Sequence, residues 1–194
     1  MDKLSYAIGM SMAQNLRESG VSKMDIDSFV KAFKGVWNES NLELSSEEAS
    51  NILKDYFTKQ NGDMLSQNLE TGKAFLEENK KKENVVTLPS GLQYEILIEG
   101  AGKKPKATDK VKCHYHGTLI DGTVFDSSVE RGQPAVFGVN QVIQGWIEAL
   151  QLMPVGSKWR LYLPSELAYG EHGAGRAIQP NSALIFEVEL LGIE

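Results

Sequence analysis

The sequence predicts an α+β protein, in which an all-helical N-terminal module with a long connecting helix precedes a curved antiparallel β-sheet packed on one short helix. One observation is compositional: all six prolines and 13 of the 18 glycines of the 194-residue chain lie after Leu88. The other is periodic, because apolar residues recur at helical spacing before that point and alternate with polar residues after it. We therefore expect two domains, residues 1–84 and residues 85–194.

Two short amphipathic helices are expected at the N-terminus. The first carries an apolar stripe over residues 4–16 with Gly20 as its C-terminal cap, and the second follows a cap at Asp25 or Asp27 and carries a stripe over residues 29–37. Five of the six methionines also lie in this half, as adaptable packing residues of a core or of an interface. The two uses are compatible, and we expect a homodimer formed through residues 1–60.

A third helix is expected to begin at Ser45, because Ser45 and Glu48 have the S-x-x-E spacing of a capping box. Its apolar positions continue to about Lys82, which at 1.5 Å per residue corresponds to roughly 55 Å. A helix of this length either projects as a shaft or packs against a second copy of itself. Gly62 and Gly72 are positions where it could bend.

The second half has the two-residue hydrophobic period that is typical of an antiparallel sheet. Alternating apolar residues predict strands around residues 92–98, 111–115, 159–163 and 184–190. Between Val142 and Met153 the spacing becomes helical, and Pro154 and Gly156 end that helix. One short helix should therefore pack on one curved sheet.

Charge and composition exclude several functions. Residues 1–84 carry 11 Lys and Arg against 14 Asp and Glu, and residues 85–194 carry 9 against 12, so neither half offers a basic face for nucleic acid or anionic lipid. No apolar run approaches the 18 or more residues of a membrane span. As written, the chain is expected in the cytoplasm; a signal peptide removed before Met1 would place it in the periplasm or cell envelope.

Five segments of the second half, taken in order, resemble the signatures of FKBP-type peptidyl-prolyl cis-trans isomerases. They are Asp109–Leu119, Asp121–Ser128, Val142–Trp146, Ala168–Gly170 and Ile185–Leu190. The helical half is similar to the N-terminal module of bacterial two-domain members such as the macrophage infectivity potentiator. The resemblance covers nearly the whole chain. It implies an FKBP-like sheet domain, isomerisation of X-Pro bonds (EC 5.2.1.8) in proline-containing peptides and unfolded proteins, and no cofactor or metal.

Carried over position by position, the resemblance implies an aromatic binding pocket with Trp146 as its floor. Its catalytic positions are Tyr115, Phe125, Asp126, Trp146, Tyr169 and Phe186, and its substrate-binding positions are Phe137, Val142, Ile143 and Ile178. The rim departs from the family, since Ala135 stands where single-domain eukaryotic members carry an aromatic residue, and the loop is about two residues shorter. This departure puts the affinity for the macrolide inhibitors in doubt more than it does catalysis.

The pocket residues suit a reaction that breaks no covalent bond. Amide resonance imposes a barrier of about 18–20 kcal/mol on X-Pro rotation, and the twisted amide is less polar than the planar one. An apolar pocket that removes water should favour the twisted state. Lowering the rotation barrier by about 5–7 kcal/mol would accelerate the reaction 10⁴- to 10⁵-fold. We expect Tyr169 to hold the substrate carbonyl and Tyr115 to donate a hydrogen bond to Asp126.

Other interpretations stay open or are declined. Asp126 could merely tie a strand to a turn, and Trp146 could be a core residue only. The chain could be a dimeric holdase chaperone that uses the pocket only for binding, or a purely structural dimer. His114 and His116 are not expected to bind a metal. Tyr115 between them faces inward, so the two histidines face outward, and His172 is the only other histidine. The glycine-rich run at residues 170–175 lacks the lysine and helix of a phosphate loop.

Overall fold

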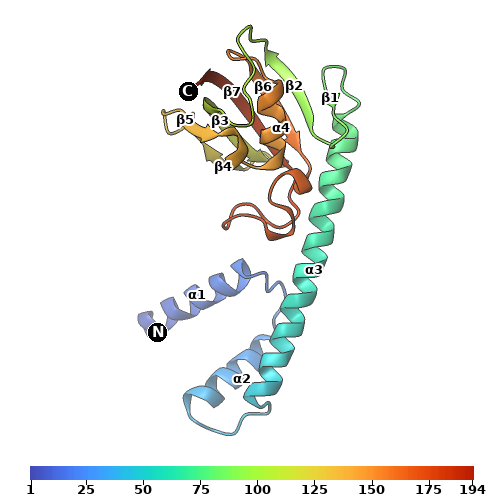
Figure 1. Cartoon of the computed structure of the whole chain (residues 1–194). Helices are drawn as coiled ribbons and strands as arrows, with labels where there is room; N and C mark the ends of the chain where they lie inside the picture. The colour runs from blue at the N-terminus through green and yellow to red at the C-terminus, as the bar shows by residue number, and fades with distance from the viewer. The chain divides into compact units, whose positions relative to one another are not determined.

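The computed structural model describes residues 1–194, apart from the side chain of Asn61. The chain divides into two compact units, residues 1–62 and residues 63–194 (Figure 1). The first unit is helical, and the second contains the end of a long helix, a sheet and a short helix, so the predicted α+β class is confirmed. None of the described helices is both long and apolar enough to cross a membrane.

Helices α1 (Lys3–Glu18) and α2 (Ile26–Trp37) begin at aspartate caps. The Asp2 and Asp25 carboxylates each accept a hydrogen bond of 2.7 Å from a backbone N–H three residues later, which satisfies one free donor of the first helical turn. Of the two candidate caps for the second helix, the structure selects Asp25. Gly20 follows the end of α1 with φ +87°, the left-handed conformation expected of a residue that ends a helix.

Helix α3 (Ser46–Asn79) begins with the expected capping box. The Ser45 hydroxyl accepts from the Glu48 N–H at 3.2 Å, and the Glu48 carboxylate accepts from the Ser45 N–H at 2.8 Å. The helix ends at Asn79, three residues before the expected end at Lys82. The Asn79 side chain is buried and donates to Gln93 at 2.9 Å, so the end of the helix is tied to the sheet.

Seven antiparallel strands form the sheet, in the spatial order β1-β2-β6-β7-β3-β4, with β5 pairing with the other half of β3. Their bounds are β1 Val86–Thr87, β2 Gln93–Ile98, β3 Lys110–Leu119, β4 Val124–Ser127, β5 Ala135–Gly138, β6 Lys158–Leu163 and β7 Leu184–Ile193. The four long strands are those that the alternation predicts. The short strands β1, β4 and β5 were not predicted, because each depends on pairing with a longer neighbour.

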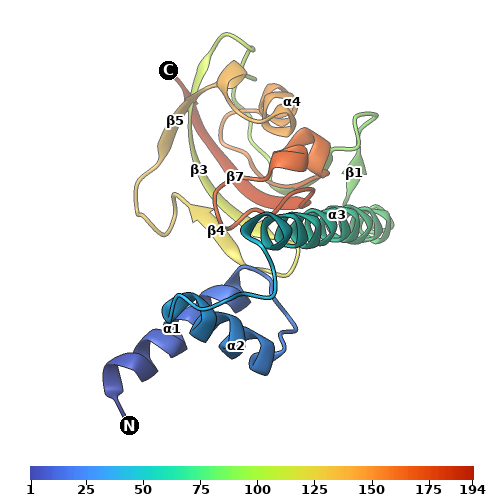
Figure 2. The ribbon, with the colours of Figure 1, turned by 90° about the horizontal axis from the view of Figure 1, so that it is seen from below.

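Helix α4 (Gln144–Leu152) packs inside the curve of the sheet, as Figure 2 shows. Its buried residues join those of β3, β6 and β7 in one core, and the alternation in β7 is complete, since Leu184, Phe186, Val188 and Leu190 are all buried. The same alternation does not bury the end of β2. Ile96 and Ile98 are about half exposed, and the register with β6 shifts between them.

The C-terminal half of α3 is part of the second unit. The Gln93 side chain donates to the Leu76 carbonyl at 2.9 Å, and the Phe75 and Tyr162 rings lie 6.1 Å apart. At Gly72 an added Cβ would lie 3.0 Å from the Ala183 Cβ, so glycine permits a close approach of helix and chain. Helix α3 is therefore a supporting element of the sheet unit over its last turns.

The segment of residues 170–183, which we call the flap, precedes β7. It follows a short 3-10 helix, Ser165–Leu167, and the two residues Ala168 and Tyr169. It contains a second 3-10 turn, Gly170–His172, and closes on itself through a bridge between Ala174 and Ile178. The Asn181 N–H donates to the Gly170 carbonyl at 2.8 Å, which joins the two ends of the flap. Gly173 and Gly175 adopt left-handed φ values of +62° and +57°.

Candidate active site

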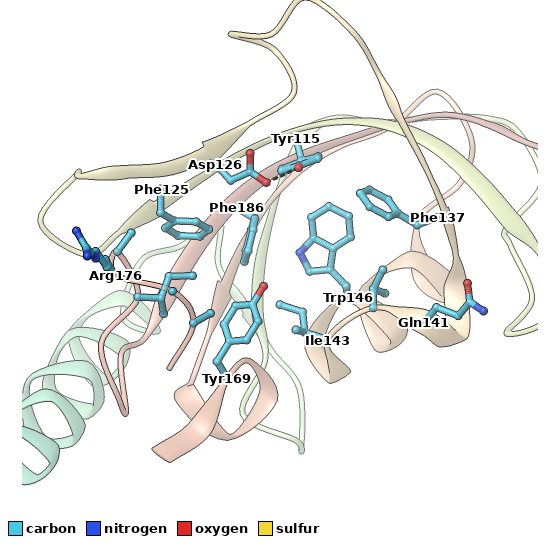
Figure 3. Close-up of a pocket in the computed structure, with 15 residues that line it drawn as sticks. Tyr115, Phe125, Asp126, Phe137, Gln141, Ile143, Trp146, Tyr169, Arg176 and Phe186 are labelled. Atoms are coloured by element: carbon cyan, nitrogen blue, oxygen red, sulfur yellow. Dashed lines mark hydrogen bonds between the residues drawn. The ribbon is translucent and has the colours of Figure 1, made fainter. Parts of the chain in front are cut away.

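One cavity of about 690 Å³ opens on the concave side of the sheet, between β3, β4, β5, α4 and the flap (Figure 3). All ten residues that the resemblance implies line it: Tyr115, Phe125, Asp126, Phe137, Val142, Ile143, Trp146, Tyr169, Ile178 and Phe186. They come from seven separate places in the chain: β3, β4, β5, residues 142–146, Tyr169, the flap and β7. The fold therefore brings the whole predicted set to one place.

Trp146 lies in the first turn of α4 and forms the floor. Its ring makes edge-to-face contacts with Tyr115, Phe137 and Phe186, at centroid distances of 5.5, 5.8 and 5.3 Å. Such contacts are favoured by aromatic quadrupoles and hold the ring orientations. The Trp146 side chain is buried, and among the described residues its indole N–H has no hydrogen-bond partner.

Phe125 and Phe186 form one wall because Gly117 leaves room for them. An added Cβ at Gly117 would lie 2.7 Å from the Phe125 ring and 2.9 Å from the Phe186 ring, both closer than real contacts allow. The two rings meet edge to face at 5.4 Å. Gly117 is therefore a packing requirement of the cavity, although it does not line the cavity itself.

The single carboxylate of the cavity is held in a polar triad. The Tyr115 hydroxyl donates to Asp126 at 2.5 Å, as the sequence predicts, and Arg131 forms an ion pair with the same carboxylate. Arg131 also donates to the Tyr115 hydroxyl at 2.8 Å and lies over the Tyr115 ring at 5.6 Å. The role of Arg131 was not predicted.

The triad keeps Asp126 ionised. Burial alone would favour the neutral acid, but the hydrogen bonds from Tyr115 and Arg131, together with the arginine charge, outweigh it and hold the pKa of Asp126 below its ordinary value. Burial and the neighbouring carboxylate raise the pKa of Tyr115. The cavity thus contains a neutral phenol beside a compensated carboxylate, which is consistent with a mainly apolar wall.

Tyr169 precedes the flap, and its hydroxyl points into the cavity between Trp146 and Phe125 (Figure 3). Burial and then the charge of Asp126 raise its pKa, so the hydroxyl remains a hydrogen-bond donor at neutral pH. A donor at this position could reach a carbonyl of a ligand that rests on Trp146. The carbonyl-holding role of Tyr169 stays a prediction.

Sequence reasoning missed several residues of the cavity. Gln141 and four flap residues, Ala174, Gly175, Arg176 and Ala177, also line it. Arg176 carries a charge at the rim, and Figure 3 shows it beyond Phe125, away from Trp146. The glycine-rich composition of residues 170–175 did not indicate which side chains of the flap would face inward.

The residues that were declined as functional lie where the alternation of β3 puts them. The Nδ1 atoms of His114 and His116 lie 3.1 and 3.0 Å from the Ser128 and Ser127 hydroxyls, respectively. Within the part of the chain that the structure describes, no group of three or more His, Cys, Asp or Glu residues could hold a metal ion. Cys113 is buried, and burial raises the pKa of its thiol to about 12, so the thiol is unreactive at neutral pH.

The fold and cavity define a class of protein that the comparisons name. Residues 101–191 match the family model of the FKBP-type peptidyl-prolyl cis-trans isomerase, and residues 1–96 match that of the domain amino-terminal to it. The chain is 48% identical to the FKBP-type isomerase FkpA of Aeromonas hydrophila over 208 residues, which cover 100% of this chain and 76% of that protein. It is 47% identical to the FKBP-type 22 kDa isomerase of Escherichia coli K12, over 97% of this chain and 93% of the relative.

Two further similarities extend along the chain. The outer membrane protein MIP of Legionella longbeachae is 43% identical and is covered to 85% by this chain. The crystal structure of FkpA from Escherichia coli matches 98% of this chain and 93% of its own with a TM-score of 0.83 and 34% identity. The chain therefore belongs to the two-domain FKBP-type peptidyl-prolyl cis-trans isomerases. Its reaction is rotation about the peptide bond that precedes proline.

Proposed function

We propose that the cavity is the catalytic site and that its residues act without covalent chemistry. The substrate proline packs on Trp146 between Phe137 and Phe186, and the Tyr169 hydroxyl donates to the carbonyl that precedes the proline. Tyr115 and Asp126 shape the wall that faces the rotating carbonyl. The observation that supports these roles best is the convergence of all ten implied residues on one aromatic cavity.

The mechanism follows from the polarity of the amide. A planar X-Pro amide is conjugated and is stabilised by water, whereas the twisted amide has lost conjugation and is less polar. A pocket walled by aromatic rings removes that water and grips the ring, so it binds the twisted state more tightly than the planar state. The ion pair with Arg131 suits this role, because it compensates the only carboxylate of the cavity.

We also propose a homodimer formed through residues 1–60. Between α1 and α2 lies a mostly apolar groove of about 600 Å³ that includes Ile8, Met12, Phe33 and Trp37. The Trp37 side chain is 77% exposed. Exposed side chains of this size are costly in water, and a second copy could cover them.

Three other assignments remain predictions. The functional division is at residues 84 and 85, with the helical half for dimerisation and the sheet half for isomerisation. The compartment is either the cytoplasm or the periplasm and cell envelope, and the name of the Legionella relative, an outer membrane protein, supports the second. Macrolide inhibitors are candidate ligands of the cavity, at an affinity reduced by the small residue Ala135 on β5.

The catalytic assignment is tested by cis-to-trans relaxation of a short X-Pro peptide in an assay without a coupling protease. Trp146→Ala and Tyr169→Phe should lower kcat/KM, the first by about tenfold or more, equivalent to at least ~1.4 kcal/mol. His114→Ala and Cys113→Ser should stay within a few-fold, since neither side chain lines the cavity. A wild-type rate equal to the thermal rate at micromolar protein would reject the assignment and favour the holdase.

A further inference from the structure

A second hollow adjoins the proline cavity. This side groove, about 560 Å³, lies between α3, the turn after β3 and the flap, and it includes Gln67, Thr71, Asp121 and Gln179. Ala177 lines both the side groove and the proline cavity, so the two hollows meet at that residue. All of its residues belong to the unit of residues 63–194.

The two long walls of the side groove are tied together. The Asn68 side chain on α3 donates to the Pro180 carbonyl of the flap at 2.8 Å, and the Asn181 side chain of the flap donates to the Leu65 carbonyl of α3 at 3.1 Å. Asn181 adopts a left-handed φ of +57°, a conformation that asparagine tolerates better than most residues. Reciprocal bonds of this kind hold the groove open at a defined width.

The chemistry of the side groove fits a peptide main chain. Gln67, Thr71, Gln179 and Ser182 offer neutral donors and acceptors, and Asp121 is the single charged residue of the lining. Such groups can pair with backbone N–H and C=O groups of any sequence. A site that reads backbone in this way suits an enzyme whose substrates are unfolded proteins of varied sequence.

The geometry of the catalytic site gives the direction of the chain. In the proposed binding mode the proline rests on Trp146 and the preceding carbonyl meets the Tyr169 hydroxyl. Phe125 and Arg176 lie on the far side of that hydroxyl from Trp146 (Figure 3). Ala177 is the next flap residue, and the side groove begins there. A chain that continues from that carbonyl away from the proline ring would pass Phe125 and Arg176 and reach the side groove at Ala177, so we assign the side groove to the residues N-terminal to proline.

We propose that the side groove is an extended substrate subsite that binds the main chain of the residues N-terminal to the isomerised proline. The proposal rests on the catalytic role of the cavity. It assigns the C-terminal half of α3 a direct part in substrate binding. Contacts retained in the transition state would then raise kcat/KM for long substrates.

The test uses the full-length chain and three peptides that share one X-Pro core: a tetrapeptide, and the same peptide extended by four Ala, Ser or Gly residues on its N-terminal or its C-terminal side. N-terminal extension should raise kcat/KM about three- to tenfold, equivalent to ~0.7–1.4 kcal/mol. C-terminal extension should change it by less than about twofold.

Thr71→Trp should fill the side groove and abolish the gain while leaving tetrapeptide turnover unchanged. Glu70→Trp is the matched control, because Glu70 is exposed on the same helix but does not line the side groove. In the wild type, the backbone amide NMR signals of Gln67 and Thr71 should shift with the N-extended peptide only. This readout needs no variant.

Equal kcat/KM for all three peptides, a gain from C-terminal extension alone, or a gain that survives Thr71→Trp would each overturn the subsite. None of these outcomes contradicts the proposed catalytic role, because turnover of the tetrapeptide tests that role independently of the side groove. Absence of tetrapeptide turnover in the wild type would instead reject the catalytic role.

Discussion

Asp126 is a carboxylate among aromatic rings, and Arg131 makes that placement tolerable. An uncompensated charge in an apolar surround would be costly and would favour the neutral acid. Here the arginine pairs with the carboxylate and also binds the phenol that donates to it. The three groups form one polar unit at the edge of an apolar cavity.

Removing the arginine should change the titration of Asp126. The folded-state pKa is lowered, so the ion pair stabilises the fold above the unfolded aspartate pKa of about 3.9, and this stabilisation is lost as the pH falls through the folded pKa. In Arg131→Leu the pKa should rise relative to the wild type, because burial then acts with less opposition. The carboxyl ¹³C shift of Asp126, followed from pH 7 down to acid unfolding, measures the change.

Lys104→Leu removes one positive charge from a loop away from the cavity and serves as the control. This substitution should leave the pKa of Asp126 unchanged. An unchanged Asp126 midpoint in Arg131→Leu would show that Tyr115 and the neighbouring backbone N–H groups suffice to hold the carboxylate.

The cavity residues that could be predicted are those that lie on regular elements. Tyr115 and Phe186 alternate inward on long strands, and Trp146 lies on a helix with a clear apolar face, so position in sequence gives direction in space. Arg131 and Arg176 lie in loops shaped by left-handed glycines at 132 and 175. Their side-chain directions depend on those loop conformations, which no periodicity encodes.

Helix starts were predictable because their caps are local. The Ser45 and Glu48 bonds join residues three apart, so the spacing of the two residue types in the sequence indicates them. The end of α3 was predicted three residues late, because it is set by a long-range contact between Asn79 and Gln93. Similarly, alternation marks Ile96 and Ile98 as a strand face but does not tell whether anything covers that face.

The last turns of α3 should contribute to the stability of the isomerase unit. Leu76 is buried there, and its carbonyl accepts from the buried amide of Gln93. A fragment of residues 85–194 loses both contacts and exposes the Tyr162 ring, whereas a fragment of residues 63–194 keeps them. We expect the shorter fragment to be less stable by at least ~2 kcal/mol, because it loses the burial of Leu76 against the sheet and the hydrogen bond from Gln93 to the Leu76 carbonyl.

Urea unfolding of the two fragments measures this difference. Gln93→Leu in the longer fragment is a useful comparison, because it removes the amide but keeps the helix. Equal midpoints for the two fragments would show that the isomerase domain is complete from residue 85 and that α3 only lies beside it.

At the scale of the whole molecule, the two units present different surfaces. Residues 63–194 bury one contiguous core, but residues 1–62 leave large apolar side chains exposed along α1 and α2. These surfaces motivate the homodimer. Two catalytic sites in one particle would raise the local concentration of an unfolded client's prolines at a site, an advantage that a tetrapeptide cannot use.

Disrupting the proposed homodimer should therefore separate two activities. Ile8→Glu combined with Phe33→Glu introduces charge into the apolar groove between α1 and α2, and we expect sedimentation to show a monomer at micromolar concentration. Peptide kcat/KM per chain should stay within about twofold, because the cavity lies wholly in residues 63–194. Acceleration of proline-limited refolding of a whole protein should fall several-fold, because a client released by one site no longer has a second site nearby.

Lys23→Gln combined with Lys31→Gln makes the same change in formal charge at exposed positions outside that groove, and it should leave both activities and the proposed dimer intact. Full refolding activity in a confirmed monomer would limit the helical half to a role other than client capture.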